Sequence, residues 1–117
     1  MGRLTTHVLD TAHGMPGAGM RVRLYRKEGA DYALLKEVVT NADGRCDSPL
    51  LEAGAFASGR YRLVFAAGPY FAAKGARLPQ PAFVDDVTLD FGVANADAHY
   101  HVPLLVSPYS YSTYRGS

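Results

Sequence analysis

The chain has 117 residues, of which 48% are hydrophobic, and a formal net charge of +1. A chain of this length forms a single domain, residues 1–117, and buries about two-thirds of its unfolded surface. Its nine arginines are dispersed along the sequence. This charge distribution lacks the strong positive field of a nucleic-acid-binding protein. No apolar run reaches the roughly 20 residues of a membrane span, so we expect neither a nucleic acid nor a membrane as partner.

The cellular compartment is predicted from the cysteine content and the two ends of the sequence. Cys46 is the single cysteine, which excludes an internal disulfide. The first residues lack the apolar core of a signal peptide, and residues 115–117 do not spell a peroxisomal signal. We therefore expect a cytoplasmic protein.

Apolar and polar residues alternate with period two along most of the chain. This alternation predicts about eight strands, at residues 4–10, 20–26, 32–40, a short one beginning at Arg45, 60–67, 84–93, 99–106 and 109–115. Glycine-rich segments at 13–19 and 41–44 predict a loop and a turn. Residues 69–75 are the one candidate helix, with Pro69 at its first position. The pattern predicts an all-β protein, an antiparallel β-sandwich with one short helix.

The predicted strand 99–106 has two different faces. Its even-numbered residues are apolar or aromatic and suit a protein core, whereas the opposite face mixes His99 and His101 with Pro103 and Leu105. Because that second face mixes polar imidazoles with apolar residues, it suits neither full exposure to solvent nor burial in an apolar core. We therefore expect another subunit to cover it and to leave a polar pocket inside. Pro103 cannot donate a ladder hydrogen bond and predicts a local bulge.

The predicted last strand, 109–115, carries three tyrosines and Arg115, and we expect it to be docked onto the domain. An ordinary edge strand is the alternative. Two further polar residues draw attention: His7 lies on the face of strand 4–10 opposite the core, and Arg45 follows a turn. By themselves these positions favour a hydrogen-bonded bystander for His7 and a solvent-facing arginine for Arg45 over a catalytic role. We interpret Cys46 as a small buried residue.

Four segments carry a resemblance to a known family: residues 4–10, 43–46, 99–108 and 114–117. They resemble the 5-hydroxyisourate hydrolases, the transthyretin-related enzymes of urate breakdown. The terminal segment 114–117 is the pattern that separates those hydrolases from the hormone-carrying transthyretins. The resemblance covers nearly the whole chain, although the link at 76–82 is less aromatic than in the family. It implies a transthyretin-like sandwich of two four-stranded sheets, assembled as a homotetramer, a dimer of dimers.

The resemblance also implies a reaction and a set of catalytic residues. The reaction is hydrolysis of 5-hydroxyisourate at its N1–C6 amide bond, giving 2-oxo-4-hydroxy-4-carboxy-5-ureidoimidazoline. His7 and His101 would activate water and relay its proton, because imidazole titrates near neutral pH. Arg45 would bind the planar substrate and counter the developing oxyanion. Which histidine is the base stays open.

The terminal residues would complete the substrate site in a channel between dimers. The resemblance implies that Ser117, Tyr114, Arg115 and Gly116 bind the substrate. Gly116 fits this role, since a residue without Cβ lets the backbone approach a ligand closely. No cofactor and no metal are implied.

Three alternatives remain open from the sequence. His99 and His101 have a spacing that zinc sites use, and His7 would be the third ligand; otherwise His99 is a supporting or interface residue. The same channel could hold a small aromatic ligand without turnover, as in a transthyretin-like binding protein. A purely structural sandwich that pairs through its edges is the third alternative.

Overall fold

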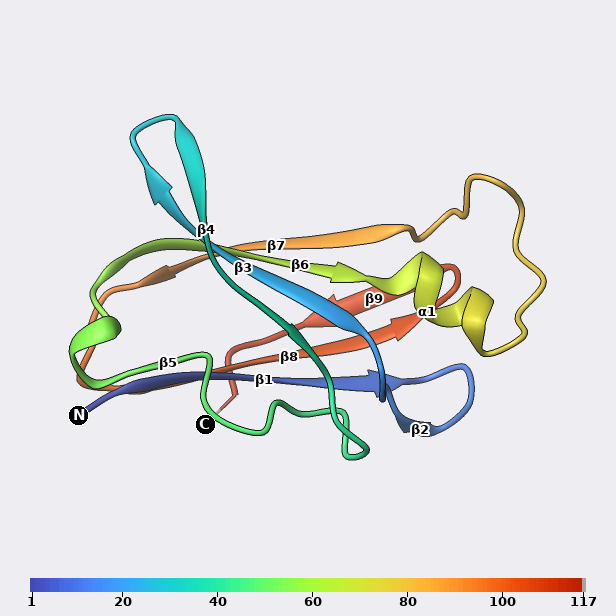
Figure 1. The fold of residues 1–117 in the computed structure, drawn as a ribbon, viewed down its shortest axis with the longest axis horizontal. Helices are drawn as coiled ribbons and strands as arrows, with labels where there is room; N and C mark the ends of the chain where they lie inside the picture. The colour runs from blue at the N-terminus through green and yellow to red at the C-terminus, as the bar shows by residue number, and fades with distance from the viewer. Residues whose placement is uncertain (117) are drawn as a thin grey trace.

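The computed structural model describes residues 1–116, and it shows a β-sandwich (Figure 1). One sheet has the order β2-β1-β8-β9, with β5 also paired to β1, and the other has the order β4-β3-β6-β7. The described strands are β1 (Arg3–Asp10), β2 (Met15–Pro16), β3 (Arg21–Glu28), β4 (Asp31–Val39), β5 (Leu51–Glu52), β6 (Gly59–Ala66), β7 (Asp86–Val93), β8 (His99–Ser107) and β9 (Ser110–Thr113). Helix α1 (Ala67–Ala73) lies at one end of the sandwich, and a single 3₁₀ turn, η1 (Ala53–Ala55), follows β5. The predicted sandwich with one short helix is confirmed.

Several details differ from the sequence predictions. The two-residue strands β2 and β5 were missed, since two residues are too few to give a periodic signal, and the sheets have five and four strands. Arg45 does not begin a strand but forms an isolated bridge with His7. Helix α1 begins at Ala67, so Pro69 is its third residue. Proline is tolerated there because the first N–H groups of a helix have no intrahelical partner.

The pairing of β1 with β8 positions the polar residues of interest. These two strands are parallel, from Arg3 opposite His99 to Asp10 opposite Val106, whereas the remaining pairs are antiparallel. The register places Thr5 opposite His101. Odd-numbered residues of both strands therefore share one face of the sheet, and even-numbered residues share the other.

Pro103 lies within a continuous register, so the predicted bulge is wrong. The ladder between β8 and β9 runs from Ser107–Ser110 to Leu104–Thr113, and it resumes in the same register at the bridge between His101 and Gly116. Pro103 lies where this ladder is interrupted. Because proline has no backbone N–H, it could not donate a ladder hydrogen bond there. The Thr113 hydroxyl donates instead to the Pro103 carbonyl, at 2.7 Å. An irregular register occurs elsewhere, between β3 and β4 at Leu24 and Tyr25.

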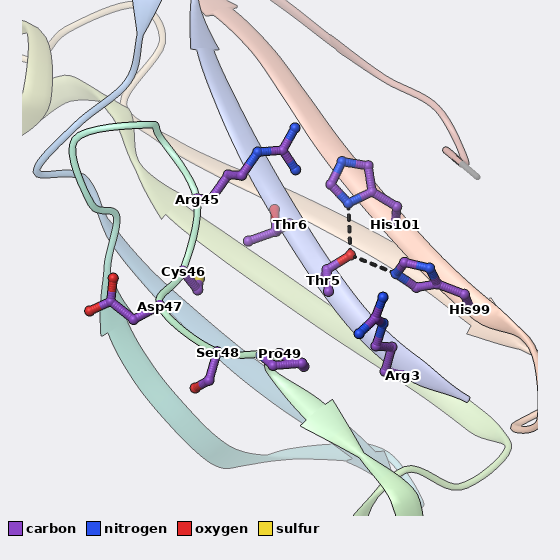
Figure 2. A pocket seen from close by; sticks show the side chains of 10 residues that line it. All are labelled: Arg3, Thr5, Thr6, Arg45, Cys46, Asp47, Ser48, Pro49, His99 and His101. Atoms are coloured by element: carbon purple, nitrogen blue, oxygen red, sulfur yellow. Dashed lines mark hydrogen bonds between the residues drawn. The ribbon is translucent and has the colours of Figure 1, made fainter. Parts of the chain in front are cut away.

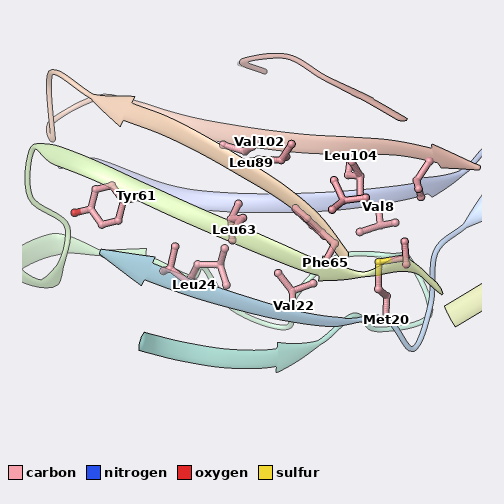
Figure 3. Packing of buried hydrophobic residues seen from close by; sticks show 14 of the residues in the cluster. Val8, Met20, Val22, Leu24, Tyr61, Leu63, Phe65, Leu89, Val102 and Leu104 are labelled. Carbon is pink, nitrogen blue, oxygen red and sulfur yellow. The ribbon is translucent and has the colours of Figure 1, made fainter. Parts of the chain in front are cut away.

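The core lies between the two sheets, where apolar side chains of both meet (Figure 3). The predicted inward faces are confirmed, since alternate residues of β1, β3, β6 and β8 are almost fully buried: Leu4, Val8, Val22, Leu24, Tyr61, Leu63, Phe65, Val102 and Leu104. Within residues 1–116, no helix is long and apolar enough to cross a membrane. The opposite face of β1 and β8 is half-exposed at Thr5, His7, His99 and His101, and this face carries the site.

A buried carboxylate links helix α1 to the end of β1. Asp10 is fully buried and accepts hydrogen bonds from the Tyr70 hydroxyl at 2.8 Å and from the backbone N–H of His13 at 2.9 Å. The His13 ring nitrogen Nδ1 lies 2.7 Å from the same carboxylate. Burial tends to raise the pKa of Asp10, but the bonds from His13 and Tyr70 outweigh it and lower the pKa. The cluster joins two distant segments of the chain.

Candidate active site

The structure brings His7, His101 and Arg45 together on the outer face of the first sheet. His7 and His101 come from the neighbouring strands β1 and β8, and their ring centroids lie 6.2 Å apart at an interplanar angle of 28°. Arg45 forms a backbone bridge with His7. Residues from opposite ends of the sequence are thus placed side by side by the parallel β1–β8 pair.

The turn before Arg45 fixes the backbone position of this arginine. The side-chain oxygen of Asn41 accepts the backbone N–H groups of Asp43 and Arg45, at 2.9 and 3.1 Å. Gly44 adopts a φ of 75°, which favours glycine, and its carbonyl accepts the N–H of Val8 at 2.8 Å. A Cβ at Gly44 would collide with the Val8 carbonyl. The loop is therefore held against β1 by its backbone.

A cavity of about 380 Å³ opens beside the two strands. Its lining residues come from β1, β8 and the loop 45–49, namely Arg3, Thr5, Thr6, Arg45, Cys46, Asp47, Ser48, Pro49, His99 and His101. Figure 2 shows Arg45 extending over β1 toward His101, with Arg3 near His99 on the same side. Two guanidinium groups and two imidazoles thus surround a space suited to a small polar molecule.

Thr5 connects two of the histidines. Its hydroxyl oxygen lies 2.8 Å from Nδ1 of His101 and 3.1 Å from Nε2 of His99, the two dashed contacts in Figure 2. Thr5 lies opposite His101 in the strand register. The ring of His101 is therefore tied to β1 through a single hydroxyl.

The electrostatics of the site favour neutral imidazoles. Burial lowers the pKa of His7, and the positive charge of Arg45 lowers it further. Burial likewise lowers the pKa of His101, with additional contributions from Arg45, His7 and His99. Both rings are therefore in the neutral form at neutral pH and able to accept a proton.

The terminal residues lie at two different sites: Gly116 lies beside His101, whereas Tyr114 and Arg115 line another cavity. The N–H of Gly116 donates to the carbonyl of His101 at 2.7 Å, and a Cβ there would stand 2.8 Å from Cδ2 of the His101 ring. Tyr114 and Arg115 instead line a second cavity of about 340 Å³ between β7 and the β8–β9 side, where the Arg115 guanidinium stacks on Tyr100 at 4.0 Å. Ser117 lies outside the described residues.

The geometry narrows the alternatives left open for His99 and corrects the predicted burial of Cys46. Among residues 1–116, no three His, Cys, Asp or Glu side chains are grouped to hold a metal ion. His99 instead lines the cavity and contacts Thr5. Cys46 is partly buried rather than fully so, and burial raises the pKa of its thiol, with Asp47 adding to the effect. A thiol with a raised pKa is a poor nucleophile at neutral pH.

The sequence interpretation missed several residues that line the cavity. Thr5 and Arg3 share the outer face with His7, so the period-two pattern of residues 4–10 already contained the signal for them. Asp47, Ser48 and Pro49 follow a turn without periodicity, and no sequence signal indicated that the loop folds over β1.

The fold and the site together define a class of protein: a two-sheet β-sandwich with a histidine–arginine pocket on the outer face of one sheet. The chain belongs to the HIUase/Transthyretin family, whose sequence pattern matches residues 4–116. It is 62% identical over 117 residues to a 5-hydroxyisourate hydrolase of Pseudomonas aeruginosa, a match that covers all of this chain and 93% of the relative.

Two solved structures are similar over nearly the whole chain. The structure of Klebsiella pneumoniae 5-hydroxyisourate hydrolase has a TM-score of 0.82 and 37% identity, with both chains fully covered. A crystal structure of (S)-allantoin synthase has a TM-score of 0.94 and 50% identity. That match covers 99% of this chain but only 44% of the longer synthase chain.

Proposed function

We propose that this protein hydrolyses 5-hydroxyisourate, opening its six-membered ring at the N1–C6 amide bond. The observation that carries the proposal is that His101 and Arg45 line one cavity, while His7, which does not line it, has its ring centroid 6.2 Å from that of His101 and its backbone bridged to Arg45. The high identity to a 5-hydroxyisourate hydrolase over the full chain supports the same substrate. The product would be 2-oxo-4-hydroxy-4-carboxy-5-ureidoimidazoline.

Water needs a base in this reaction, because it is a weak nucleophile at neutral pH. A neutral imidazole supplies that base, and general acid–base catalysis contributes roughly 10² to 10⁴ in rate. The lowered pKa values of His7 and His101 keep both rings neutral at neutral pH. We assign proton transfer to this pair, with His101 as the base, because His101 lines the cavity and His7 does not.

In the proposed reaction His101 carries the proton from water to the leaving nitrogen, and Arg45 binds the negative charge that develops on the carbonyl oxygen. His101 removes a proton from water as the water oxygen attacks C6, and the carbonyl oxygen gains negative charge. The guanidinium of Arg45 binds that oxyanion. The tetrahedral intermediate then collapses with cleavage of the C6–N1 bond. The imidazolium returns its proton to N1, which restores the neutral ring.

The backbone at Gly116 supports a role for the terminal segment in substrate binding. The N–H of Gly116 donates to the carbonyl of His101, so Gly116 lies next to the proposed base. We propose that Gly116 and Ser117 line the substrate end. Tyr114 and Arg115 line the second cavity rather than the one beside His101, although the Arg115 guanidinium donates to the backbone carbonyl of His99 at 3.3 Å. These two residues would contribute only indirectly, or across an interface.

We further propose a homotetramer, assembled as a dimer of dimers in which the site lies between dimers. The support is an accumulation of exposed aromatic side chains beyond β8, at Tyr109, Tyr111 and Tyr114, which are 62%, 49% and 61% exposed. Aromatic side chains are enriched at protein interfaces relative to the rest of the surface. Light scattering at micromolar concentration should give four times the mass of the chain, whereas a monomer would contradict the assembly. The cytoplasmic location stays a prediction, to be tested by cell fractionation.

A direct assay tests the proposed reaction. Purified protein is added to freshly generated 5-hydroxyisourate, and its ultraviolet absorbance decay is compared with the uncatalysed decay. We expect a rate proportional to protein concentration that is lost in His101→Asn. Saturable binding of the substrate without acceleration would instead indicate a transthyretin-like binding protein.

A further inference from the structure

Thr5 is the one described side chain that contacts both His99 and His101 through a hydrogen-bonding atom. Its hydroxyl oxygen lies 2.8 Å from Nδ1 of His101 and 3.1 Å from Nε2 of His99. The position follows from the β1–β8 register, in which Thr5 lies opposite His101 and Arg3 lies opposite His99. Thr5 is β-branched, which restricts its side-chain rotamer and holds the hydroxyl between the two rings.

A hydroxyl has one hydrogen to donate and two lone pairs with which to accept. With a ring nitrogen at hydrogen-bond distance on each side, Thr5 cannot donate to both. At least one of the two ring nitrogens must therefore carry its own hydrogen and donate it to Thr5. The protonation patterns of His99 and His101 are thereby linked through one oxygen atom.

The direction of this link decides whether His101 can act as a base. When Nδ1 of His101 carries the hydrogen and donates it to Thr5, the lone pair of Nε2 is free to accept a proton. When Thr5 donates to Nδ1, the neutral ring carries its hydrogen on Nε2 and has no free lone pair. The hydrogen bond at one ring nitrogen sets the state of the other.

His99 selects between these two directions. If Nε2 of His99 is unprotonated, it accepts the single hydrogen of the Thr5 hydroxyl. The Thr5 oxygen is then left with lone pairs only toward His101, and it must accept from Nδ1. Removing the ring of His99 frees the Thr5 hydrogen to turn toward His101.

We propose that Thr5, with its hydroxyl hydrogen engaged by His99, is a positioning residue that holds His101 in the tautomer with a free Nε2. This inference rests on the proposed hydrolysis for its effect on rate, but not for its effect on the ring itself. It gives His99 a function in the site, as the acceptor that orients Thr5. Neither residue is required to touch the substrate.

The test compares variants that remove or keep the Thr5 hydroxyl. Thr5→Val preserves the shape and removes the hydroxyl, so kcat should fall by about 10²-fold, the lower end of the range for general acid–base catalysis, with KM little changed. Thr5→Ser restores the hydroxyl and should recover most of kcat. His99→Phe, which removes the acceptor, should lower kcat less than Thr5→Val does.

A matched control removes a hydroxyl at the far end of the same pair of strands, away from the cavity. Thr11 donates its hydroxyl to the Val106 carbonyl at 3.0 Å, just beyond the end of β1. Thr11→Val should lower the melting temperature while leaving kcat at the parental value. Equal losses of kcat in Thr5→Val and Thr11→Val would overturn the positioning role, since both would then reflect general loosening of the β1–β8 pair.

A spectroscopic readout separates this proposal from the proposed reaction. In protein labelled with ¹⁵N-histidine and free of substrate, the His101 resonances should show hydrogen on Nδ1, and Thr5→Val should shift the population toward hydrogen on Nε2. Hydrogen on Nε2 of His101 in the parental protein, or no response to Thr5→Val, would overturn the proposal. A Thr5-dependent tautomer in a protein that does not turn over 5-hydroxyisourate would overturn the proposed reaction alone.

Discussion

Two histidines near opposite ends of β1 have opposite environments. His13, just beyond the strand, lies 2.7 Å from the carboxylate of Asp10, which is fully buried and also bonded by Tyr70. His101, paired with the other half of β1, has its pKa lowered by burial and, further, by the neighbouring Arg45, His7 and His99. One histidine has an acidic partner, and the other is surrounded by basic groups.

The difference shows how the same side chain serves structure in one place and chemistry in another. An acidic partner satisfies the ring of His13 and links the loop after β1 to helix α1. Basic neighbours and burial favour the neutral form of His101, and its accessible cavity leaves that ring available for proton transfer. We therefore expect substitutions at His101 to affect rate, and substitutions around His13 to affect stability.

The largest effect is expected for His101→Asn. Asparagine keeps a polar side chain but cannot accept a proton at neutral pH, so kcat/KM should fall by roughly 10² to 10⁴. Steady-state kinetics and the melting temperature should be measured together. A parental rate in this variant would show that His101 is not the base. It would also contradict the distinction between a catalytic His101 and a structural His13.

Arg45→Lys should have the next largest effect. Lysine keeps the positive charge but lacks the planar fork of a guanidinium, so binding of the oxyanion is weakened. We expect kcat/KM to fall by about 10²-fold, the lower end of the cost of removing one oxyanion donor. Because the charge is retained, the acid limb of the pH–rate profile should stay below the ordinary histidine pKa of about 6.5. An unchanged rate would show that charge alone suffices at this position.

Gly116→Ala tests the contact of the terminal segment with His101. The added Cβ would stand 2.8 Å from the His101 ring, so the ring or the backbone must move. A displacement of about 1 Å costs on the order of 10²-fold in rate, and for a smaller shift we expect roughly a tenfold fall in kcat/KM. Gly54→Ala, at a glycine of η1 where an added Cβ would meet no other atom within 4 Å, is the control for a general effect of glycine replacement.

Asp10→Asn should have the smallest effect on rate and a clear effect on stability. The change weakens hydrogen bonds from His13 and Tyr70 to a buried carboxylate, which we expect to lower the free energy of unfolding by about 1–3 kcal/mol. Since the folded pKa of Asp10 is lowered, its stabilisation is complete above the unfolded pKa of about 3.9 and is lost as pH falls through the folded value.

Denaturant unfolding at several pH values measures this contribution. The parental protein should lose stability on acidification more steeply than Asp10→Asn, while kcat at neutral pH stays the same in both. A large loss of kcat in Asp10→Asn without loss of stability would contradict the division between a structural and a chemical histidine.

The amino-acid sequence by itself determined the sandwich and much of its core. Strand period is a local property, so Leu4 and Val8 on β1 and Val102 and Leu104 on β8 could be placed inward from alternation alone. The short pairings of β2 and β5 could not be foreseen, because two residues give no period. The predicted bulge at Pro103 was wrong because the neighbouring chain leaves the ladder at that residue and returns in register.

The tertiary structure decided the site. His7, Arg45 and His101 are distant in sequence, and their proximity depends on a parallel β1–β8 pair and a loop held to β1 by Gly44. The family resemblance had named these three residues, but the hydroxyl of Thr5 between two rings became visible only once the register was known. Local sequence sets which face a side chain occupies, whereas strand register sets which side chains meet. Catalytic geometry depends on strand register.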